Sequence, residues 1–266
     1  YFYLSERECA GGVVVFDPRD GAEAGWVSFV PAVTEAERVW EGRGQVEGTD
    51  LSAFAGWLEA RRGRPTAGLG TPPVDLAIDR ALSARTREAF NHARRVKDAG
   101  EVDRIRAAAA ATAAGFATLA PLIRPGQSER ELQIELEAGF FRAGASRPGY
   151  GTIIGSGPNS AVLHFEPSER RLRDGEFLLV DAGAEIDRYM ADVTRTYVAG
   201  TPSAFQRDLY DVVLGAEERA IARCVPGAEW KALHLATAVD LVSGLVNLGV
   251  MRGQPESLVE QEAHTL

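Results

Sequence analysis

Two apolar runs near the middle of the chain each contain an aspartate. Residues 177–180 are continuously apolar, the pattern of a strand buried on both faces, and Asp181 follows directly. Residues 185–198 alternate, which places Asp192 and Thr194 on one face of a second predicted strand. Aspartate is depleted in strands, and an unpaired carboxylate is costly to bury. The two runs therefore predict a shared counter-charge, and a cation is the simplest one.

The distance between these aspartates depends on how the two strands pair. If they pair antiparallel with Asp181 opposite Asp192, the side-chain stems lie roughly 5 Å apart, and both carboxylates reach one ion or bridge two. In the alternative interpretation, Asp181 opens an Asx turn at Gly183 and Asp192 is paired with Arg188 or Arg195. The pattern alone leaves both possibilities open.

The first part of the chain, residues 1–95, predicts a small α/β domain with no catalytic constellation. The expected elements are strands at 12–16, 26–30, 66–69 and 74–78, and one helix capped by Asp50.

The second part, residues 96–266, predicts helices in pairs. A helix from Glu101 ends at a Pro-Gly turn, Ser128 and Glu131 form a capping box for the next helix, and a glycine-rich loop spans residues 149–157.

The same order returns after residue 200. Ser203 and Gln206 form another capping box, and a second Pro-Gly turn at residues 226–227 precedes a fourth helix. We interpret this as an internal duplication of helix, Pro-Gly turn, helix and strand pair. The second copy has no strand pair, so we expect the chain to be cut short.

Composition narrows the class of protein. The 266 residues are 45% hydrophobic and 25% charged, as in globular proteins of one or two domains. The net charge is −9 and the basic residues are interleaved with acids, which argues against nucleic-acid binding. Cys9 and Cys224 fit neither a disulfide framework nor a thiolate zinc site, so we expect a cytoplasmic protein. The alanine-rich run 107–123 is shorter than the roughly 20 residues of a membrane span and predicts a core helix.

Five short segments together resemble a known family. They are residues 150–159, 163–165, 173–175, 179–185 and 189–196. They resemble the front half of the catalytic domain in the aminopeptidase P and prolidase branch of the pita-bread metallopeptidases. Residues 1–16 and 37–43 are similar to the family's N-terminal domain, and residues 95–101 are similar to the entry of its catalytic domain. The resemblance implies a creatinase-like α/β domain at 1–95 and an α+β pita-bread domain at 96–266, truncated in its C-terminal half.

The resemblance also implies roles for particular residues. Asp181 matches the aspartate that chelates one metal of a dinuclear centre, and Asp192 matches the one that bridges both metals. His164 matches the histidine that lines the substrate pocket and donates a hydrogen bond to substrate or to the tetrahedral intermediate. Thr194 and Arg195 would orient the bridging carboxylate. For His164 the alternative is a loop histidine satisfied by backbone groups.

The implied cofactors are two divalent ions, with Mn²⁺ favoured by oxygen-rich ligation and Co²⁺ or Zn²⁺ as alternatives. The family also needs a metal-binding histidine and two glutamates, which would follow the last residue of this sequence. His264 lies in a segment that resembles the one just before the family's metal-binding histidine, so His264 does not match that histidine itself. We therefore expect the chain, if truly truncated, to be inactive.

The implied activity is hydrolysis of the N-terminal Xaa-Pro bond of a peptide with proline at its second position. A homo-oligomer, dimer or tetramer, is implied as well, with the N-terminal domain as its contact. Three alternatives stay open: a prolidase restricted to dipeptides, an inactive homologue that binds peptides or proteins, and a methionine aminopeptidase, which would normally lack a domain like residues 1–95.

Overall fold

The structure is a computed structural model that describes residues 2–72 and 74–263. It consists of two compact units, one up to Val102 and one from Asp103 onward. The sequence placed this division slightly earlier, between residues 95 and 96.

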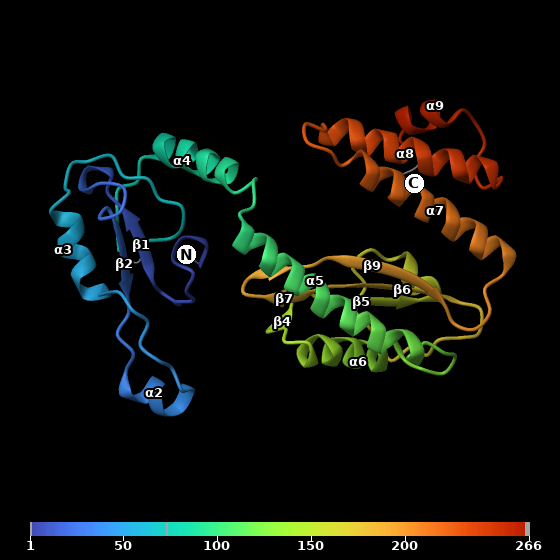
Figure 1. Cartoon of the computed structure of the whole chain (residues 1–266), viewed down its shortest axis with the longest axis horizontal. Helices are drawn as coiled ribbons and strands as arrows, with labels where there is room; N and C mark the ends of the chain where they lie inside the picture. Colours follow the sequence, from blue (N-terminus) through green and yellow to red (C-terminus); the bar gives the residue numbers. More distant parts are fainter. Residues whose placement is uncertain (1, 73, 264–266) are drawn as a thin grey trace. The chain divides into compact units, whose positions relative to one another are not determined.

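The first unit is built on a small three-stranded sheet in the order β1-β2-β3 (Figure 1). The predicted hairpin is confirmed, because β1 and β2 pair antiparallel, whereas β3 adds in parallel. The strands are β1 (Val13–Phe16), β2 (Trp26–Val30) and β3 (Thr49–Asp50). The helices are α1 (Phe2–Ser5), α2 (Glu35–Glu41), α3 (Phe54–Glu59) and α4 (Arg80–Ala93), with 3-10 turns at Pro18–Asp20 and Leu51–Ala53.

The predicted strands at 66–69 and 74–78 are wrong, since the described residues there are irregular. Side chains of the following helix satisfy backbone groups that a strand would have paired: the Gly68 N–H donates to Ser83 Oγ at 3.0 Å. Pro73 lies outside the described residues. An apolar run flanked by prolines therefore packs as an extended loop here, without a neighbouring strand.

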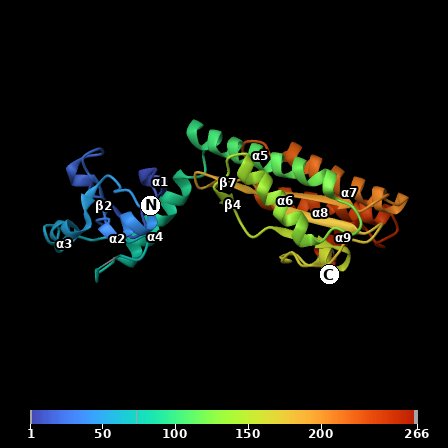
Figure 2. The ribbon, with the colours of Figure 1, turned by 90° about the horizontal axis from the view of Figure 1, so that it is seen from below.

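The second unit contains the remaining elements, ordered as two helical pairs around short strands (Figures 1 and 2). The helices are α5 (Ala99–Leu119), α6 (Glu129–Arg142), α7 (Ala204–Arg223), α8 (Trp230–Asn247) and α9 (Pro255–Glu260), with 3-10 helices at Ala120–Leu122 and Gly157–Ala161. The strands are β4 (Arg147–Pro148), β5 (Ile153–Ser156), β6 (Phe177–Ala182), β7 (Ala184–Ile186), β8 (Tyr189–Met190) and β9 (Val193–Val198).

The sheet β5-β6-β9 carries the core on one of its faces. Along β6, Leu178, Val180 and Ala182 are fully buried, and they belong to the same core cluster as apolar side chains of α5 and α6. Because side chains alternate along a strand, Asp181 points to the opposite face. The helices thus cover one face of the sheet and leave the aspartate on the other.

Helices α5 and α6 lie side by side, as both views show (Figures 1 and 2). Glycines set their separation: a Cβ on Gly139 would lie 2.7 Å from the Gly115 Cα, so neither position has room for a side chain. Among the described residues one helical stretch, Ala99–Leu122, is long and apolar enough to cross a membrane by length and composition, which is weak evidence. Its Phe116 and Leu119 lie in the core of this unit, as expected for a core helix.

The predicted capping boxes and Pro-Gly turns of this unit are confirmed, whereas the helix predicted from Glu101 begins at Ala99. Both predicted capping boxes form, with Ser128 and Ser203 each accepting a hydrogen bond from the backbone N–H three residues later. Both Pro-Gly turns place their glycine in the left-handed region, Gly126 at φ 94° and Gly227 at φ 85°. The short helix α9, which the sequence did not predict, packs Val259 against the buried side of α8.

Candidate active site

The two aspartate-bearing strands pair antiparallel, but not in the register that would place Asp181 opposite Asp192. Asp181 lies opposite Thr194, and Asp192 comes just before β9 begins. The predicted pairing of Asp181 with Asp192 is therefore wrong. The reason is an extra hairpin, β7 and β8, which belongs to a separate sheet and turns at Asp187 and Arg188 with φ values of 48° and 66°.

Gly183 explains how Asp192 nevertheless comes close to the end of β6. A Cβ on this glycine would overlap with the carbonyl oxygen of Ala191. Only a residue without a side chain lets the segment before β9 approach the end of β6 so closely. The close approach brings Asp192 back to Asp181 after the hairpin.

The two carboxylates converge on one hydroxyl group. Tyr150 Oη donates to Asp181 Oδ1 at 2.5 Å and lies 3.1 Å from Asp192 Oδ1. Asp181 Oδ2 accepts a further hydrogen bond from Thr194 Oγ1 at 2.8 Å. Asp181 is half-buried and Asp192 is exposed, so the pair opens to solvent on the side of Asp192.

Arginines do not neutralise this pair. Arg195 Nη1 donates to the Thr194 carbonyl at 2.8 Å, and Arg188 lies 3.9 Å from Glu185. Within the described residues no basic side chain forms an ion pair with Asp181 or Asp192, so the arginine alternative is wrong. The expected supports differ too, because among the described residues Thr194 Oγ1 donates a hydrogen bond to Asp181 and not to Asp192, and Arg195 forms no hydrogen bond or ion pair with either carboxylate.

Tyr150 is the site residue that sequence reasoning missed. Its burial raises the pKa of its hydroxyl, and the hydrogen bonds and charges of Asp181 and Asp192 raise that pKa further, well above the usual range. The phenol therefore stays protonated, and its single hydrogen is donated to Asp181 at the shorter distance, while Asp192 lies 3.1 Å from the same oxygen. Nothing in the spacing of Tyr150 alone marked it.

Recognising strand β5 in the sequence would have identified Tyr150 as a site residue. The sequence assigned residues 149–157 to a loop, but Ile153 pairs with Asp181 in the sheet. A strand was overlooked because Gly155 interrupts it, and this glycine is required where a Cβ would lie 2.6 Å from the Asn159 carbonyl oxygen. With β5 recognised, the tyrosine just before it would have been placed beside the end of β6.

His164 follows the 3-10 helix Gly157–Ala161 and is exposed. It makes no hydrogen bond or ion pair with any described residue, so the alternative of a backbone-satisfied loop histidine has no support among them. Its role toward substrate stays a prediction. His264, expected to precede a further metal ligand, lies outside the described residues.

The donor set suits divalent cations. Two carboxylate oxygens that share one hydroxyl donor point at a common location, and carboxylate oxygens are ligands for Mn²⁺, Mg²⁺ and Zn²⁺. In the described part of the chain no group of three or more His, Cys, Asp or Glu side chains could hold an ion. Asp181 and Asp192 therefore fit as two ligands of a metal site that requires further donors.

Comparison with known proteins defines the class. The sequence profile of metallopeptidase family M24 matches residues 103–252, more than half of the chain, and the chain belongs to this family. The structure of Pseudomonas aeruginosa aminopeptidase PepP superposes with a TM-score of 0.81 at 29% identity, covering 98% of this chain and 66% of that one. A zinc-substituted Escherichia coli aminopeptidase P in complex with product gives a TM-score of 0.78 at 25% identity, with 99% and 67% covered. The fold is that of aminopeptidase P, the pita-bread fold.

Curated relatives narrow the comparison to one activity. An Xaa-Pro aminopeptidase of Escherichia coli is 36% identical over 179 residues, which are 67% of this chain and 41% of the relative. Xaa-Pro aminopeptidase 1 of Streptomyces coelicolor is 30% identical over 98% of this chain and 58% of its own length. The chain thus spans between about two fifths and three fifths of these relatives.

Proposed function

We propose that this protein is a metal-dependent Xaa-Pro aminopeptidase, which removes the first residue of peptides whose second residue is proline. The observation that carries the proposal is the convergence of Asp181 and Asp192 on the Tyr150 hydroxyl, in a chain of family M24. The names of its relatives supply the substrate class, since those matched here are Xaa-Pro aminopeptidases.

The chain's own residues have distinct parts in this proposal. Asp181 and Asp192 would hold the divalent ions, and Tyr150 and Thr194 fix the carboxylate orientations. His164 donates a hydrogen bond to the substrate or to the tetrahedral intermediate. The chemistry that such ions supply when bound is a water acidic enough to give hydroxide near neutral pH and a polarised carbonyl. The nitrogen of the Xaa-Pro bond carries no N–H before cleavage, so the pocket has to recognise the shape of the proline ring. Like any amide nitrogen, it has to gain a proton to leave as an amine.

Manganese is the metal we propose, because a site rich in carboxylate oxygens favours hard cations over zinc. Zinc and cobalt remain alternatives for the same ligands. We also propose a cytoplasmic homo-oligomer. The reducing location is supported by two cysteines that are free in the described structure, Cys9 and Cys224.

The test is a substrate panel with the protein purified at the length at which the cell makes it. With Mn²⁺ added, we expect release of the first residue from a tripeptide Xaa-Pro-Xaa, no release from Xaa-Ala-Xaa, and loss of turnover in EDTA that Mn²⁺ restores. Cleavage of Xaa-Pro dipeptides only would indicate a prolidase. Stable binding of proline peptides without any turnover would instead indicate an inactive homologue.

A further inference from the structure

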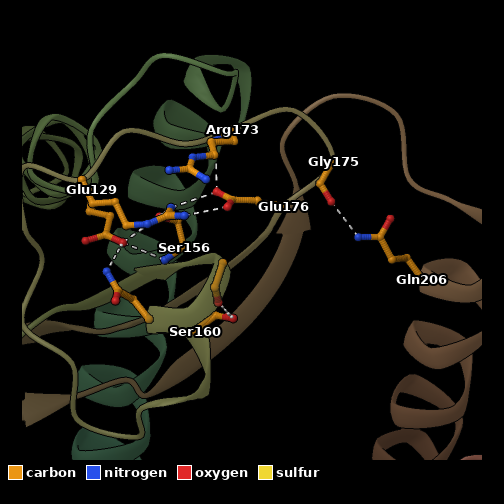
Figure 3. Close-up of polar contacts among 10 residues, drawn as sticks. Glu129, Ser156, Ser160, Arg173, Gly175, Glu176 and Gln206 are labelled. Atoms are coloured by element: carbon orange, nitrogen blue, oxygen red, sulfur yellow. Dashed lines mark hydrogen bonds and ion pairs between the residues drawn. The ribbon is translucent and has the colours of Figure 1, made fainter.

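Another carboxylate of the unit that begins at Asp103, that of Glu129, is fully buried and takes no part in the proposed chemistry. It is the first residue of α6, and five hydrogen bonds converge on it. Its Oε1 accepts from Ser156 N at 2.8 Å, Ser156 Oγ at 2.7 Å and Asn159 Nδ2 at 2.9 Å. Its Oε2 accepts from Ser168 N at 3.1 Å and Ser168 Oγ at 2.5 Å. Figure 3 shows Glu129 facing Ser156 at the end of β5.

Two of these donor residues, Ser156 and Ser168, flank one loop, residues 157–167, and the third, Asn159, lies in the 3-10 helix at its start. Ser156 is the residue before the loop and Ser168 the residue after it, so the two oxygens of Glu129 each hold one end. The outer part of the loop has little support of its own: Leu163 is 87% exposed and His164 is exposed without a partner among the described residues. The position of His164 therefore depends on where the loop ends are held.

The backbone of α6 reinforces the same junction. The Glu129 N–H donates to the Arg170 carbonyl at 3.1 Å, and the Arg130 N–H donates to the Ser168 carbonyl at 3.0 Å. The free N–H groups of a helix N-terminus are thus used to hold the segment after the loop. A carboxylate at this end of a helix is also favoured by the helix dipole.

Arg170 supplies the positive counter-charge to Glu129, and the Ser156 hydroxyl lies between the two side chains. Its Nη1 donates to Ser156 Oγ at 2.6 Å, and the same hydroxyl donates to Glu129. The guanidinium is itself fixed by two hydrogen bonds to Glu176, at 2.8 and 2.6 Å. Glu176 stands directly before β6, so the network joins both loop ends to the strand that carries Asp181 (Figure 3).

Glu129 is ionised in this setting. Burial raises the pKa of its carboxyl group, but the hydrogen bonds from Ser168, Ser156 and Asn159 outweigh burial and leave the pKa below its usual value. The five donors occupy both carboxylate oxygens, so Glu129 has no free position from which to exchange a proton with substrate. A buried charge with complete hydrogen bonding fixes geometry.

We propose that Glu129 is a positioning residue that clamps both ends of loop 157–167 and thereby holds His164 where it meets the substrate. The catalytic half of this inference rests on the proposed function, because it requires that His164 contacts substrate. The clamping half depends only on the hydrogen bonds of the structure. A residue needed merely for folding would change stability without changing how His164 contributes to turnover.

The test compares Glu129→Gln with Glu131→Gln in the protein at its natural length. Both side chains come from the first turn of α6, but Glu131 is exposed and caps its own helix without reaching the loop. In hydrogen exchange, Glu129→Gln should speed exchange of the amides of residues 157–167 about tenfold or more, while amides of β6 keep their protection. Glu131→Gln should leave loop exchange within about twofold of wild type. Unchanged loop exchange in Glu129→Gln would overturn the clamp.

Kinetics on an Xaa-Pro tripeptide then tests the catalytic half. We expect Glu129→Gln to lower kcat about tenfold or more at unchanged metal content, as expected for a misplaced group. Adding His164→Ala to it should cost little more, since both changes remove the same contact. If the loss of kcat in the double variant equals the product of the losses in the two single variants, the proposed dependence of His164 on Glu129 is overturned. Absence of wild-type turnover would reject the proposed function and this half with it, while the exchange result still decides the clamp.

A milder variant covers the case in which Glu129→Gln does not fold. Asn159→Ala removes one of the three donors to Oε1 and leaves the carboxylate with four hydrogen bonds. It should loosen the loop less than Glu129→Gln, by a few fold in exchange, with a matching fall in kcat. Wild-type exchange and wild-type kcat together in this variant would contradict the proposal.

Discussion

Two carboxylate clusters lie in the same unit and differ in how the protein satisfies them. Glu129 is fully buried and receives five hydrogen bonds, with Arg170 nearby as counter-charge. Asp181 and Asp192 share one tyrosine hydroxyl, and Asp192 has no other hydrogen-bond partner among the described residues. The first cluster is complete without any ligand, whereas the second brings two negative charges together with few donors.

The difference separates structural carboxylates from binding ones. A buried charge is tolerated when its oxygens are saturated by donors, as at Glu129. Two carboxylates that converge without a basic partner repel each other, and a cation relieves that repulsion. The incomplete cluster is therefore the one that we assign to metal, and the complete one holds the loop that carries His164.

The largest expected effect is on the incomplete cluster. Replacing Asp192 by Ala should abolish metal binding and lower turnover about a thousandfold or more, because it removes the carboxylate that we propose as a ligand of both ions. With metal removed from both proteins, folding stability should change by no more than about 0.5 kcal/mol, since Asp192 is exposed and makes a single hydrogen bond. Elemental analysis and urea unfolding measure the two quantities.

The control is Asp208→Ala, which removes an exposed carboxylate from α7. It should leave metal content, turnover and stability at wild-type values. Metal content near the wild-type level in Asp192→Ala would count against the assignment of the incomplete cluster to metal.

The complete cluster should respond in the opposite way. Glu129→Ala leaves five donors without an acceptor and Arg170 without a nearby negative charge on that side, so we expect a loss of about 3–5 kcal/mol in the free energy of unfolding. Urea unfolding followed by circular dichroism measures it. Glu131→Ala, in the same helical turn but exposed, should cost no more than about 1 kcal/mol. Equal losses in both variants would contradict the distinction between the clusters.

Gly183→Ala tests whether backbone packing brings the incomplete cluster together. The new methyl group would overlap with the Ala191 carbonyl, so the segment before β9 has to move away from β6 and take Asp192 with it. We expect a stability loss of about 1–3 kcal/mol from this overpacking and weaker Mn²⁺ binding by calorimetric titration. Gly151→Ala is the matched control, because a Cβ there meets no atom within 4 Å. Wild-type Mn²⁺ affinity in Gly183→Ala would show that Asp192 reaches its position without this close approach.

Much of the local structure could be predicted because its causes are local. The capping boxes at Ser128 and Ser203 and the glycines that end helices depend on residues three or four positions apart, and they appear as expected. The two aspartate-bearing strands themselves followed from their apolar and alternating patterns. Their register did not, because the turn at Asp187 and Arg188 contains no glycine, the usual mark of a two-residue hairpin turn.

The polar clusters could be predicted only in part, because their members are far apart along the chain. Asp181 and Asp192 were identified as candidate site residues because aspartate is unusual in a strand. Glu129 was not, because its donors Ser156 and Ser168 follow it by 27 and 39 residues and no local pattern joins them. The same holds for Tyr150, which lies 31 residues before Asp181. Such contacts become visible once the sheet register is known.

The smallest expected effect is on the acid sensitivity of the complete cluster. The folded-state pKa of Glu129 is lowered, because hydrogen bonds from Ser168, Ser156 and Asn159 outweigh the effect of burial. A lowered pKa means that its ionised form stabilises the fold at neutral pH. That stabilisation begins to fall near the ordinary carboxyl pKa of about 4.3 and continues to fall as pH drops toward the folded value. Glu129→Gln has no such titration, so its stability should fall less steeply below about pH 4.3 than that of the wild type. Urea unfolding at a series of pH values measures how steeply the free energy of unfolding falls with pH. Glu131→Gln is the control. If stability falls as steeply in Glu129→Gln as in the wild type, the hydrogen bonds to Glu129 do not favour its ionised form.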